Sequence, residues 1–304
     1  MKIPFLFLFA LPVLGHTQAD SARPTLPVDT AVAAMPVKKT KPFHFVTNVP
    51  NDLGKTSVQP FSKKNLKTTV ILGAASAVLI LSDQAIYDGV RNFSDHIHLQ
   101  PDESNKILLS IKSGEKETVL LKVPKNLNTA FYTLGQGFTS LLLAGGLAID
   151  GVLAKRPASL QTASDLTESF IALGVSTQLL KYATGRETPS DATQRNGAFR
   201  PFPSYSDFQN NKPKYDAFPS GHLSTLMATI TILADNYPNK KWIRPVGYSL
   251  MGLSAFSMVN NGVHWAGDYP LAIGIGYLTA KIITQRHQIF VKQPKPIINI
   301  KNKV

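Results

Sequence analysis

The sequence predicts an all-α protein, built as a helical bundle of about six core helices. Two observations predict this fold: apolar segments of helical length recur along the chain, and only one stretch alternates as paired strands would. With 304 residues, the chain can bury one large core. It contains no cysteine, which excludes disulfides, thiolate metal sites and a cysteine nucleophile.

The N-terminal segment has the features of an export signal. Lys2 supplies a positive start, residues 3–15 are apolar, and Thr17-Gln18-Ala19 forms a small-residue cleavage site. We therefore predict a signal peptide at residues 1–19 and a mature chain that begins near Asp20. An uncleaved anchor helix is the alternative, although thirteen apolar residues are short for a membrane span.

A leader and a tail flank the predicted bundle. Residues 20–65 are rich in Pro, Thr, Lys and Asn, and their prolines forbid a long helix. We expect a mobile leader, in which Phe43 to Val46 docks as a short extended piece. Residues 287–304 form a basic tail, which leaves residues 66–286 as the folded domain.

Six apolar segments predict the core helices, and a hairpin separates the first two. The hairpin is predicted at Asp102 to Lys125, where alternating apolar residues flank Ser113-Gly114. The segments are apolar for only ~15–20 residues, the lower limit for a membrane span. Two arrangements therefore stay open: the helices cross a bilayer, or the bundle only associates with it. The segments are Leu66–Ser82, Asn128–Ala154, Ser159–Thr184, Gly221–Asn236, Trp242–Asn261 and Asp268–Arg286.

The net charge narrows the range of partners. Lysine and arginine total 32 against 19 acidic residues, which gives a formal charge of +13. Such an excess suits nucleic acid, an anionic membrane surface or a phosphorylated substrate. The lysines are scattered between apolar stretches, and no nucleic-acid-binding motif occurs. We therefore expect membrane association and a phosphorylated substrate, and no nucleic acid.

One stretch is suited to binding phosphate at the start of a helix. Phe218-Pro219-Ser220-Gly221-His222 leads into a predicted helix, with Ser220 as a start signal and Gly221 allowing close approach of a ligand. The first amides of a helix have no internal partner and lie at the positive end of its dipole. His222 would face the same space. An ordinary N-cap with an exposed histidine is the alternative interpretation.

Two further stretches place charged side chains near helix ends. His264 and Asp268 are four residues apart, on one face of a helix, so Asp268 can accept from one ring nitrogen and leave the other free to attack. Lys181 and Arg186 lie where a helix ends, before a polar loop. Taken alone, the first pair is more simply a surface ion pair, and the second pair complements a helix dipole. Gly185 lacks the glycine–lysine pattern of a P-loop.

Together and in this order, the three stretches resemble the type 2 phosphatidic acid phosphatase superfamily. This superfamily includes lipid phosphatases, undecaprenyl pyrophosphate phosphatases, bacterial non-specific acid phosphatases and vanadium haloperoxidases. Its motifs are lysine, six residues, Arg-Pro; then Pro-Ser-Gly-His; then Ser-Arg, five residues, histidine, three residues, aspartate. The second motif is intact here, and the resemblance covers about residues 66–286. The other residues at family spacing are Lys181, Pro189, Ser257, His264 and Asp268.

The resemblance implies a phosphatase that hydrolyses a phosphomonoester or pyrophosphate, lipid-linked or small, through a phosphohistidine. His264 would attack phosphorus, Asp268 would orient it, and His222 would protonate the leaving oxygen. The family needs no metal or other cofactor for hydrolysis. With the export signal, the resemblance implies a bacterial cell-envelope protein, membrane-associated or integral, whose active site faces the periplasm. The phosphoryl oxygens would be bound by Lys181, Arg186, Ser220 and Gly221.

Two family arginines are replaced, by Thr188 in the first motif and Met258 in the third. Such charge-assisted donors contribute on the order of 3 kcal/mol each to a transition state. Their loss predicts slow turnover, with Arg186 as a nearby substitute. A degenerate member that binds lipid or a partner protein without turnover is the second hypothesis, and a haloperoxidase would need the same missing cations. The retained histidines and aspartate favour the phosphatase.

Overall fold

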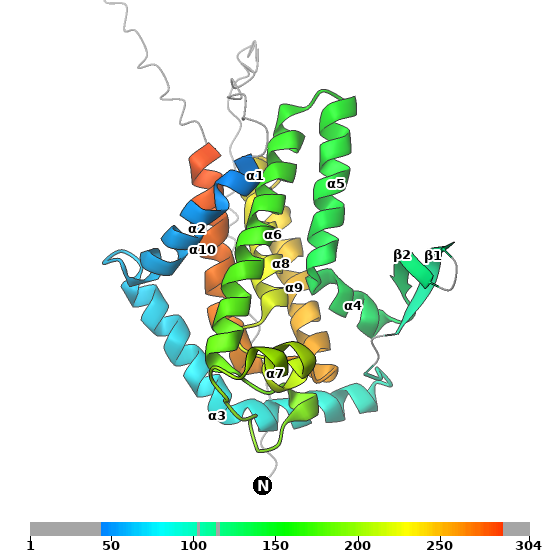
Figure 1. Cartoon of the computed structure of the whole chain (residues 1–304), viewed down its shortest axis with the longest axis vertical. Coiled ribbons are helices and arrows are strands. Elements are labelled where there is room, and N and C mark those ends of the chain that lie inside the picture. The colour runs from blue at the N-terminus through cyan, green and yellow to red at the C-terminus, as the bar shows by residue number, and fades with distance from the viewer. Residues whose placement is uncertain (1–43, 102–103, 114–115, 288–304) are drawn as a thin grey trace, which may run out of the picture. The chain divides into compact units, whose positions relative to one another are not determined.

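The computed structural model describes residues 44–101, 104–113 and 116–287 (Figure 1). The predicted signal peptide, most of the predicted leader and the basic tail lie outside the described residues. Within those residues the chain is a bundle of helices with one two-stranded sheet. The predicted all-α fold class is confirmed.

Three helices form the centre of the bundle. They are α6 (Pro157–Thr184), α8 (Gly221–Asn236) and α10 (Tyr269–His287), and each packs against the other two. Around them, α5 (Gly137–Leu153) packs on α6, α4 (Leu127–Gly135) on α9 (Ile243–Asn260), and α3 (Leu66–His96) on α9 and α10. These bounds match the predicted segments closely, except that α3 runs fourteen residues beyond Ser82 and the second segment is broken.

The break in the second segment separates α4 from α5 at Gln136, where the chain bends by 72°. Two glycines flank it at points of close helix contact. A Cβ on Gly135 would lie 2.7 Å from Ser254 Oγ and 3.2 Å from His222 Cβ, and one on Gly137 would lie 2.3 Å from the ring of Phe170. The bend therefore lets α4 lie against α8 and α9 while α5 lies against α6.

The end of the predicted leader is helical rather than extended. α1 (His44–Thr47) and α2 (Val49–Val58) both pack on α6, and the short 3-10 helix η1 (Gln59–Phe61) leads into α3. The extended piece predicted at 43–46 is therefore wrong over the residues described. Pro50 and Pro60 stand in the first turns of α2 and η1, where a missing N–H breaks no helical hydrogen bond.

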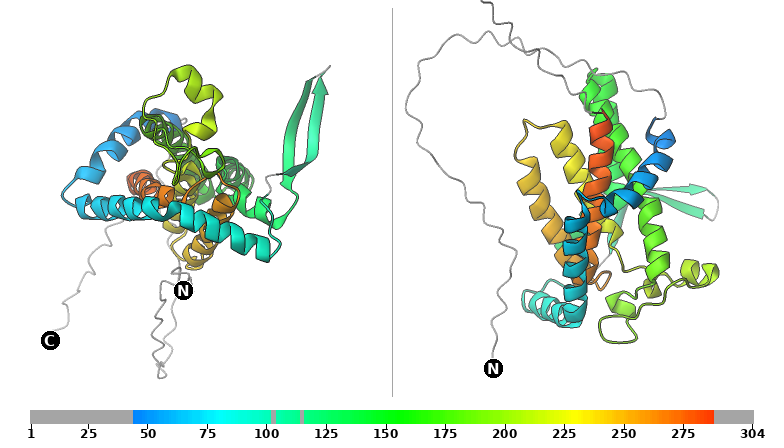
Figure 2. Two further views of the ribbon diagram at one scale, coloured as in Figure 1. Left: turned by 90° about the horizontal axis from the view of Figure 1, so that it is seen from below. Right: turned by 90° about the vertical axis from the view of Figure 1, so that its left-hand side faces the viewer.

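The predicted hairpin is present between α3 and α4. β1 (Asn105–Ser113) pairs antiparallel with β2 (Lys116–Pro124), and the hairpin projects from the helices beside α4 (Figure 2). A long connection also follows α6. It carries the 3-10 helices η2 (Pro189–Asp191) and η3 (Lys212–Lys214) and the short helix α7 (Tyr205–Asn210) before it enters α8.

The buried apolar residues form two clusters along the bundle. The lower cluster joins α3, α4, α8, α9 and α10, and the upper cluster joins α5, α6, α8 and α10. Full burial of each large side chain stabilises the fold by about 1.5–3 kcal/mol. The lower cluster contains Val90, Tyr132, Leu223, Ala255, Met258, Val259, Tyr269 and Ala272, and the upper contains Ala144, Leu166, Leu173, Ala228, Ile232 and Ala280.

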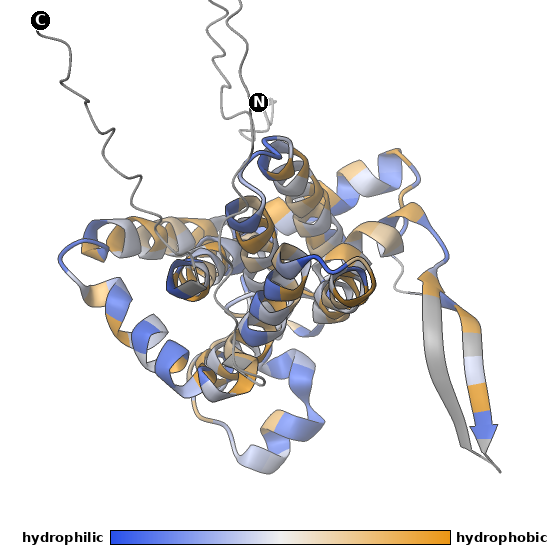
Figure 3. Cartoon of the chain, turned by 90° about the horizontal axis from the view of Figure 1, so that it is seen from above, coloured by the Kyte–Doolittle hydropathy of each residue, from blue (hydrophilic) through white to orange (hydrophobic). Residues whose placement is uncertain are grey.

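Apolar side chains also cover the outside of α3. Val70, Val78 and Leu81 are 60%, 63% and 77% exposed, and only 11% of the apolar stretch of this helix is buried. By length and composition α3 could cross a membrane, and α4 with α5 passes the same test as a bent pair. In Figure 3, hydrophobic residues (orange) accordingly occur on outer helices as well as at the centre of the bundle.

Candidate active site

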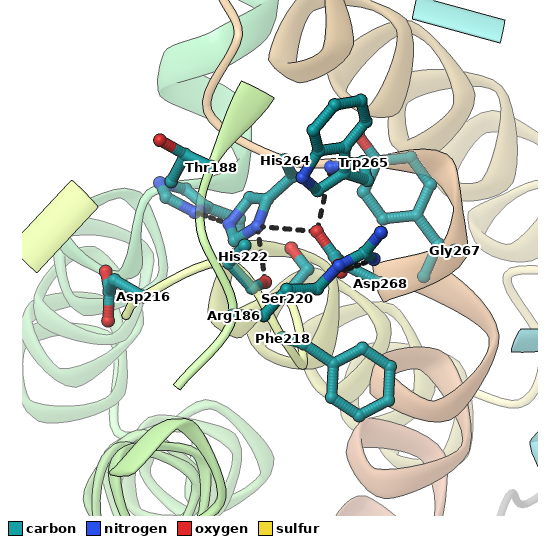
Figure 4. Close-up of polar contacts among 12 residues, drawn as sticks. Arg186, Thr188, Asp216, Phe218, Ser220, His222, His264, Trp265, Gly267 and Asp268 are labelled. Carbon is teal, nitrogen blue, oxygen red and sulfur yellow. Dashed lines mark hydrogen bonds and ion pairs between the residues drawn. The ribbon is translucent and has the colours of Figure 1, made fainter. Parts of the chain in front are cut away.

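His264 lies in a turn between α9 and α10 (Figure 4). Its Nδ1 is 2.8 Å from the carbonyl oxygen of Ala217 and 3.5 Å from Oδ2 of Asp268. Because a carbonyl oxygen can only accept, Nδ1 carries the proton and donates it. The Nε2 atom of the neutral ring therefore keeps its lone pair, which is the form that a nucleophile requires.

The spacing predicts that Asp268 and His264 lie on one face of an α-helix. In the structure, Asp268 instead reaches His264 through a 3-10 turn. It ends η4 (Ala266–Asp268), and its Oδ2 accepts from the backbone N–H of Trp265 at 2.8 Å. That hydrogen bond folds the chain back and brings the carboxylate beside the imidazole. Burial raises the pKa of Asp268 to about 6, while Arg186 opposes the shift.

Arg186 lies behind Asp268, although it was expected to bind phosphate. It follows Gly185, whose positive φ of 56° ends α6. Its Nη1 binds Asp268 Oδ1 at 2.6 Å, and its Nη2 binds Asp83 Oδ2 at 2.7 Å and the carbonyl of Asn196 at 2.7 Å. All three charged side chains are fully buried. Arg186 therefore holds the aspartate in place.

Asp83 is a site residue that the sequence did not reveal. It lies in α3, and its Oδ1 also accepts from the backbone N–H of Gly267 at 2.8 Å. A Cβ on Gly267 would lie 2.6 Å from Asp83 Oδ2, so α3 approaches η4 more closely than any other residue type would allow. The one signal in the sequence was its position, because Asp83 is an acidic residue directly after the apolar segment Leu66–Ser82.

His222 lies on the first turn of α8 and faces His264. Ser220 caps this helix, accepting from the N–H of Leu223 at 3.3 Å, as the start signal predicted. Nδ1 of His222 is 3.2 Å from Nε2 of His264, and the Tyr132 ring lies 5.3 Å from the His222 ring. Since His264 Nε2 accepts, His222 Nδ1 donates. In the alternative of an ordinary N-cap with an exposed histidine, the N-cap is present, but His222 is partly buried and faces His264.

Both imidazoles are neutral at neutral pH. Burial, followed by the charge on Lys181, lowers the pKa of His264 to about 3. Burial, followed by the neighbouring His264 and Lys181, lowers the pKa of His222 well below 6.5. Within the described part of the chain, no group of three or more His, Asp or Glu side chains converges as a metal site would.

Lys181 brings a cation to the start of α8. It lies in the last turn of α6 and is 5% exposed, and its Nζ would be 3.8 Å from a Cβ on Gly221. The same Nζ binds Oδ1 of Asp216 at 2.9 Å. Asp216, two residues before Phe218, is the other residue that the sequence analysis missed, and no sequence pattern marked it.

The two positions of the replaced arginines have different surroundings. The hydroxyl of Thr188 is 3.1 Å from that of Ser190, in the connection after α6. Met258 is fully buried in the lower core cluster, beside residues such as Tyr132 and Leu223. Ser257, also at family spacing, donates to the carbonyl of Asn128 at 2.7 Å and so joins α9 to α4.

The family model of the PAP2 superfamily matches residues 162–292. This match supports membership of the PAP2 superfamily for the segment that carries the histidine pair. No curated protein and no solved structure matches it. The matched PAP2 segment contains Lys181, both histidines and Asp268, but neither Asp83 nor Tyr132. Helices outside that segment therefore complete the surroundings of the PAP2 histidine pair.

Proposed function

We propose that the chain is a hydrolase of phosphoric esters or pyrophosphates that acts through a phosphohistidine on His264. The observation that carries this proposal is the pairing of His264 Nδ1 with the Ala217 carbonyl, which leaves Nε2 unprotonated and facing His222. Membership of the PAP2 superfamily supports chemistry on a phosphorylated substrate.

In the proposed reaction, His264 Nε2 attacks phosphorus, and an N–P bond forms while the P–O bond to the leaving group breaks. His222, protonated when the anionic substrate binds, gives a proton to the leaving oxygen and becomes neutral. Water then attacks phosphorus, His222 takes a proton from it, and the N–P bond breaks. A near-attack geometry needs about 3–3.5 Å between reacting atoms. His222 Nδ1 and His264 Nε2 are now 3.2 Å apart, so the two rings must separate to admit a phosphoryl group. A bound anion also favours the protonated form of His222.

The setting of this reaction is part of the proposal. The apolar exterior of α3 supports association with a membrane, and hence access to a lipid-linked substrate. An export signal supports a bacterial cell-envelope location with the site facing the periplasm, on the sequence of residues 1–19. The reaction as written uses no metal or other cofactor.

A trapping experiment tests the nucleophile. After brief incubation with a substrate labelled at phosphorus and an alkaline quench, the protein should carry an acid-labile label. His264→Ala should abolish the label, and the exposed His96→Ala should retain it. His222→Ala should slow release of the leaving group. Undiminished labelling of His264→Ala would exclude the proposed nucleophile.

A catalytically degenerate protein that binds lipid or a partner protein is the second candidate. It is favoured by one observation, that Lys181 and Arg186 are both already paired with carboxylates. Thr188→Arg would add a cation in the connection after α6, whereas Met258→Arg would bury one among apolar side chains. A silent parent and an active, folded Thr188→Arg protein would support this candidate.

A further inference from the structure

The positive charge at the start of α8 is largely cancelled. Lys181 is 5% exposed, so its ammonium relies on protein partners, and it forms an ion pair with Asp216. The backbone at Asp216 is held in place, because it forms a β-bridge with the backbone of Arg186. The N–H of Ala217 donates to the Arg186 carbonyl at 3.0 Å. The backbone of Asp216 is therefore a fixed part of the site.

Arg186 does not restore the missing positive charge. Its two terminal nitrogens bind Asp268, Asp83 and a backbone carbonyl, all in the interior. The charged groups that surround the histidine pair are thus two cations, Lys181 and Arg186, and three carboxylates, Asp83, Asp216 and Asp268. Their formal sum is −1, and the helix start adds only about half a positive charge.

A fixed carboxylate acts on a bound anion in proportion to the charge of that anion. A phosphomonoester carries nearly two negative charges at neutral pH, since its second pKa is about 6. A phosphodiester carries one. We propose that Asp216 makes this site select phosphoryl groups with a single negative charge, so that the preferred substrate is a phosphodiester. This inference rests on the proposed function and specifies its substrate class.

The chemistry of a diester fits the same residues. His264 Nε2 forms the N–P bond, one ester P–O bond breaks, and His222 protonates that oxygen, which leaves as an alcohol. Water then attacks phosphorus, His222 takes its proton, and the N–P bond breaks to give a phosphomonoester. The product has gained a negative charge beside Asp216, and the resulting repulsion favours its release.

A comparison of two substrates tests the role of Asp216. We would measure kcat/KM for bis(4-nitrophenyl) phosphate and 4-nitrophenyl phosphate at neutral pH with the full chain, Asp216→Asn and Asp216→Glu. Asp216→Asn should shift the ratio toward the monoester by about tenfold, because it removes one partly exposed charge and keeps an acceptor for Lys181. Asp216→Glu should keep the parent ratio. The intrinsic reactivities of the substrates cancel in this comparison.

A binding measurement separates this inference from the proposed function. Calorimetric titration with dimethyl phosphate and methyl phosphate should show that the parent binds the diester more tightly, and that Asp216→Asn narrows the difference. An unchanged preference in both assays, with normal thermal unfolding of the variants, would overturn the role of Asp216. If neither nitrophenyl substrate is hydrolysed, the proposed hydrolysis fails, and the titration alone decides the charge selection.

Discussion

At the residue scale, the proton of His264 goes to a backbone carbonyl, although a carboxylate lies nearby. The Ala217 carbonyl is the nearer at 2.8 Å, and Asp268 lies at 3.5 Å with its other oxygen bound by Arg186. The uncharged carbonyl fixes the tautomer without favouring the charged ring as strongly as a carboxylate would. A neutral acceptor is consistent with the low pKa of His264, which burial lowers to about 3.

The first prediction concerns acid stability. The folded-state pKa of His264, about 3, lies below the unfolded value of 6.5, so the unfolded chain alone takes up this proton between those values. His264 therefore costs stability as pH falls from 6.5 toward 3. Asp268, with a pKa raised to about 6 from 3.8, acts in the opposite sense between 6 and 3.8. His264→Gln should therefore reduce the pH dependence of the free energy of unfolding by up to roughly 1.4 kcal/mol per pH unit.

Thermal or urea unfolding between pH 7 and 4 measures this slope. The absolute stability of His264→Gln does not matter, because only its change with pH is compared with the parent. Equal slopes in the two proteins would mean that folding does not lower the pKa of His264.

The second prediction concerns Arg186, whose guanidinium joins two buried carboxylates. Lysine cannot bind both at once, and one buried charge would lose its partner. Arg186→Lys should therefore destabilise the fold by about 3 kcal/mol or more. Arg200→Lys is the matched control: Arg200 also pairs with a buried carboxylate, Glu187, but is 39% exposed, so the change should cost less than about 1 kcal/mol. Equal losses, measured by urea unfolding, would contradict this view.

Sequence patterns located the residues that lie within short motifs. Ser220 and His222 are placed by the start of one helix, and His264 and Asp268 by one turn, so local spacing could predict that the members of each pair lie close together. The partner of Arg186 in α3 is 103 residues away, and no periodicity reports such a contact. The pairing of Arg186 with Asp83 and Asp268 therefore cannot be predicted from its own stretch of sequence, which indicates only a helix dipole or a phosphate as its partner.

At the scale of elements, the break at Gln136 decides where α4 lies. Composition predicted one continuous helix, because its residues are apolar on both sides of the break. The tertiary contacts of Gly135 and Gly137 could not be inferred from that pattern. The bend places the Tyr132 ring 5.3 Å from the His222 ring, so α4 contacts one member of the histidine pair.

The third prediction uses this contact. Gly135→Ala would place a Cβ 3.2 Å from His222 Cβ and 2.7 Å from Ser254 Oγ, and His222 would have to shift. We expect kcat/KM to fall by about tenfold or more, together with some loss of stability. Gly145→Ala in α5 is the control, since its Cβ would meet nothing within 4 Å and should leave activity unchanged. Full activity of Gly135→Ala would show that α4 does not position His222.

At the scale of the whole described unit, the fourth prediction is that the exposed apolar face of α3 binds the membrane. If α3 enters a bilayer, lysine at its centre costs about 2.5–3.5 kcal/mol per residue. Replacing Val70, Ile71 and Val78 by lysine should therefore release the protein from vesicles in a flotation assay while leaving hydrolysis of a soluble ester intact. The same change at the exposed Ile107, Leu108 and Ile111 of the hairpin is the control. Release by the hairpin variant alone would assign membrane contact to β1.

Because Asp83 contacts Arg186 and Gly267, α3 contributes a side chain to the site and cannot be replaced by any other apolar helix. A chimera that carried an unrelated apolar helix of equal length in its place would keep every family motif and the means to reach a membrane. It would lose the carboxylate that holds Arg186, and the close packing that only a glycine at 267 permits. During synthesis, moreover, Asp83 leaves the ribosome long before Gly267 is made, so the site is completed only when the last helices return to the first long one.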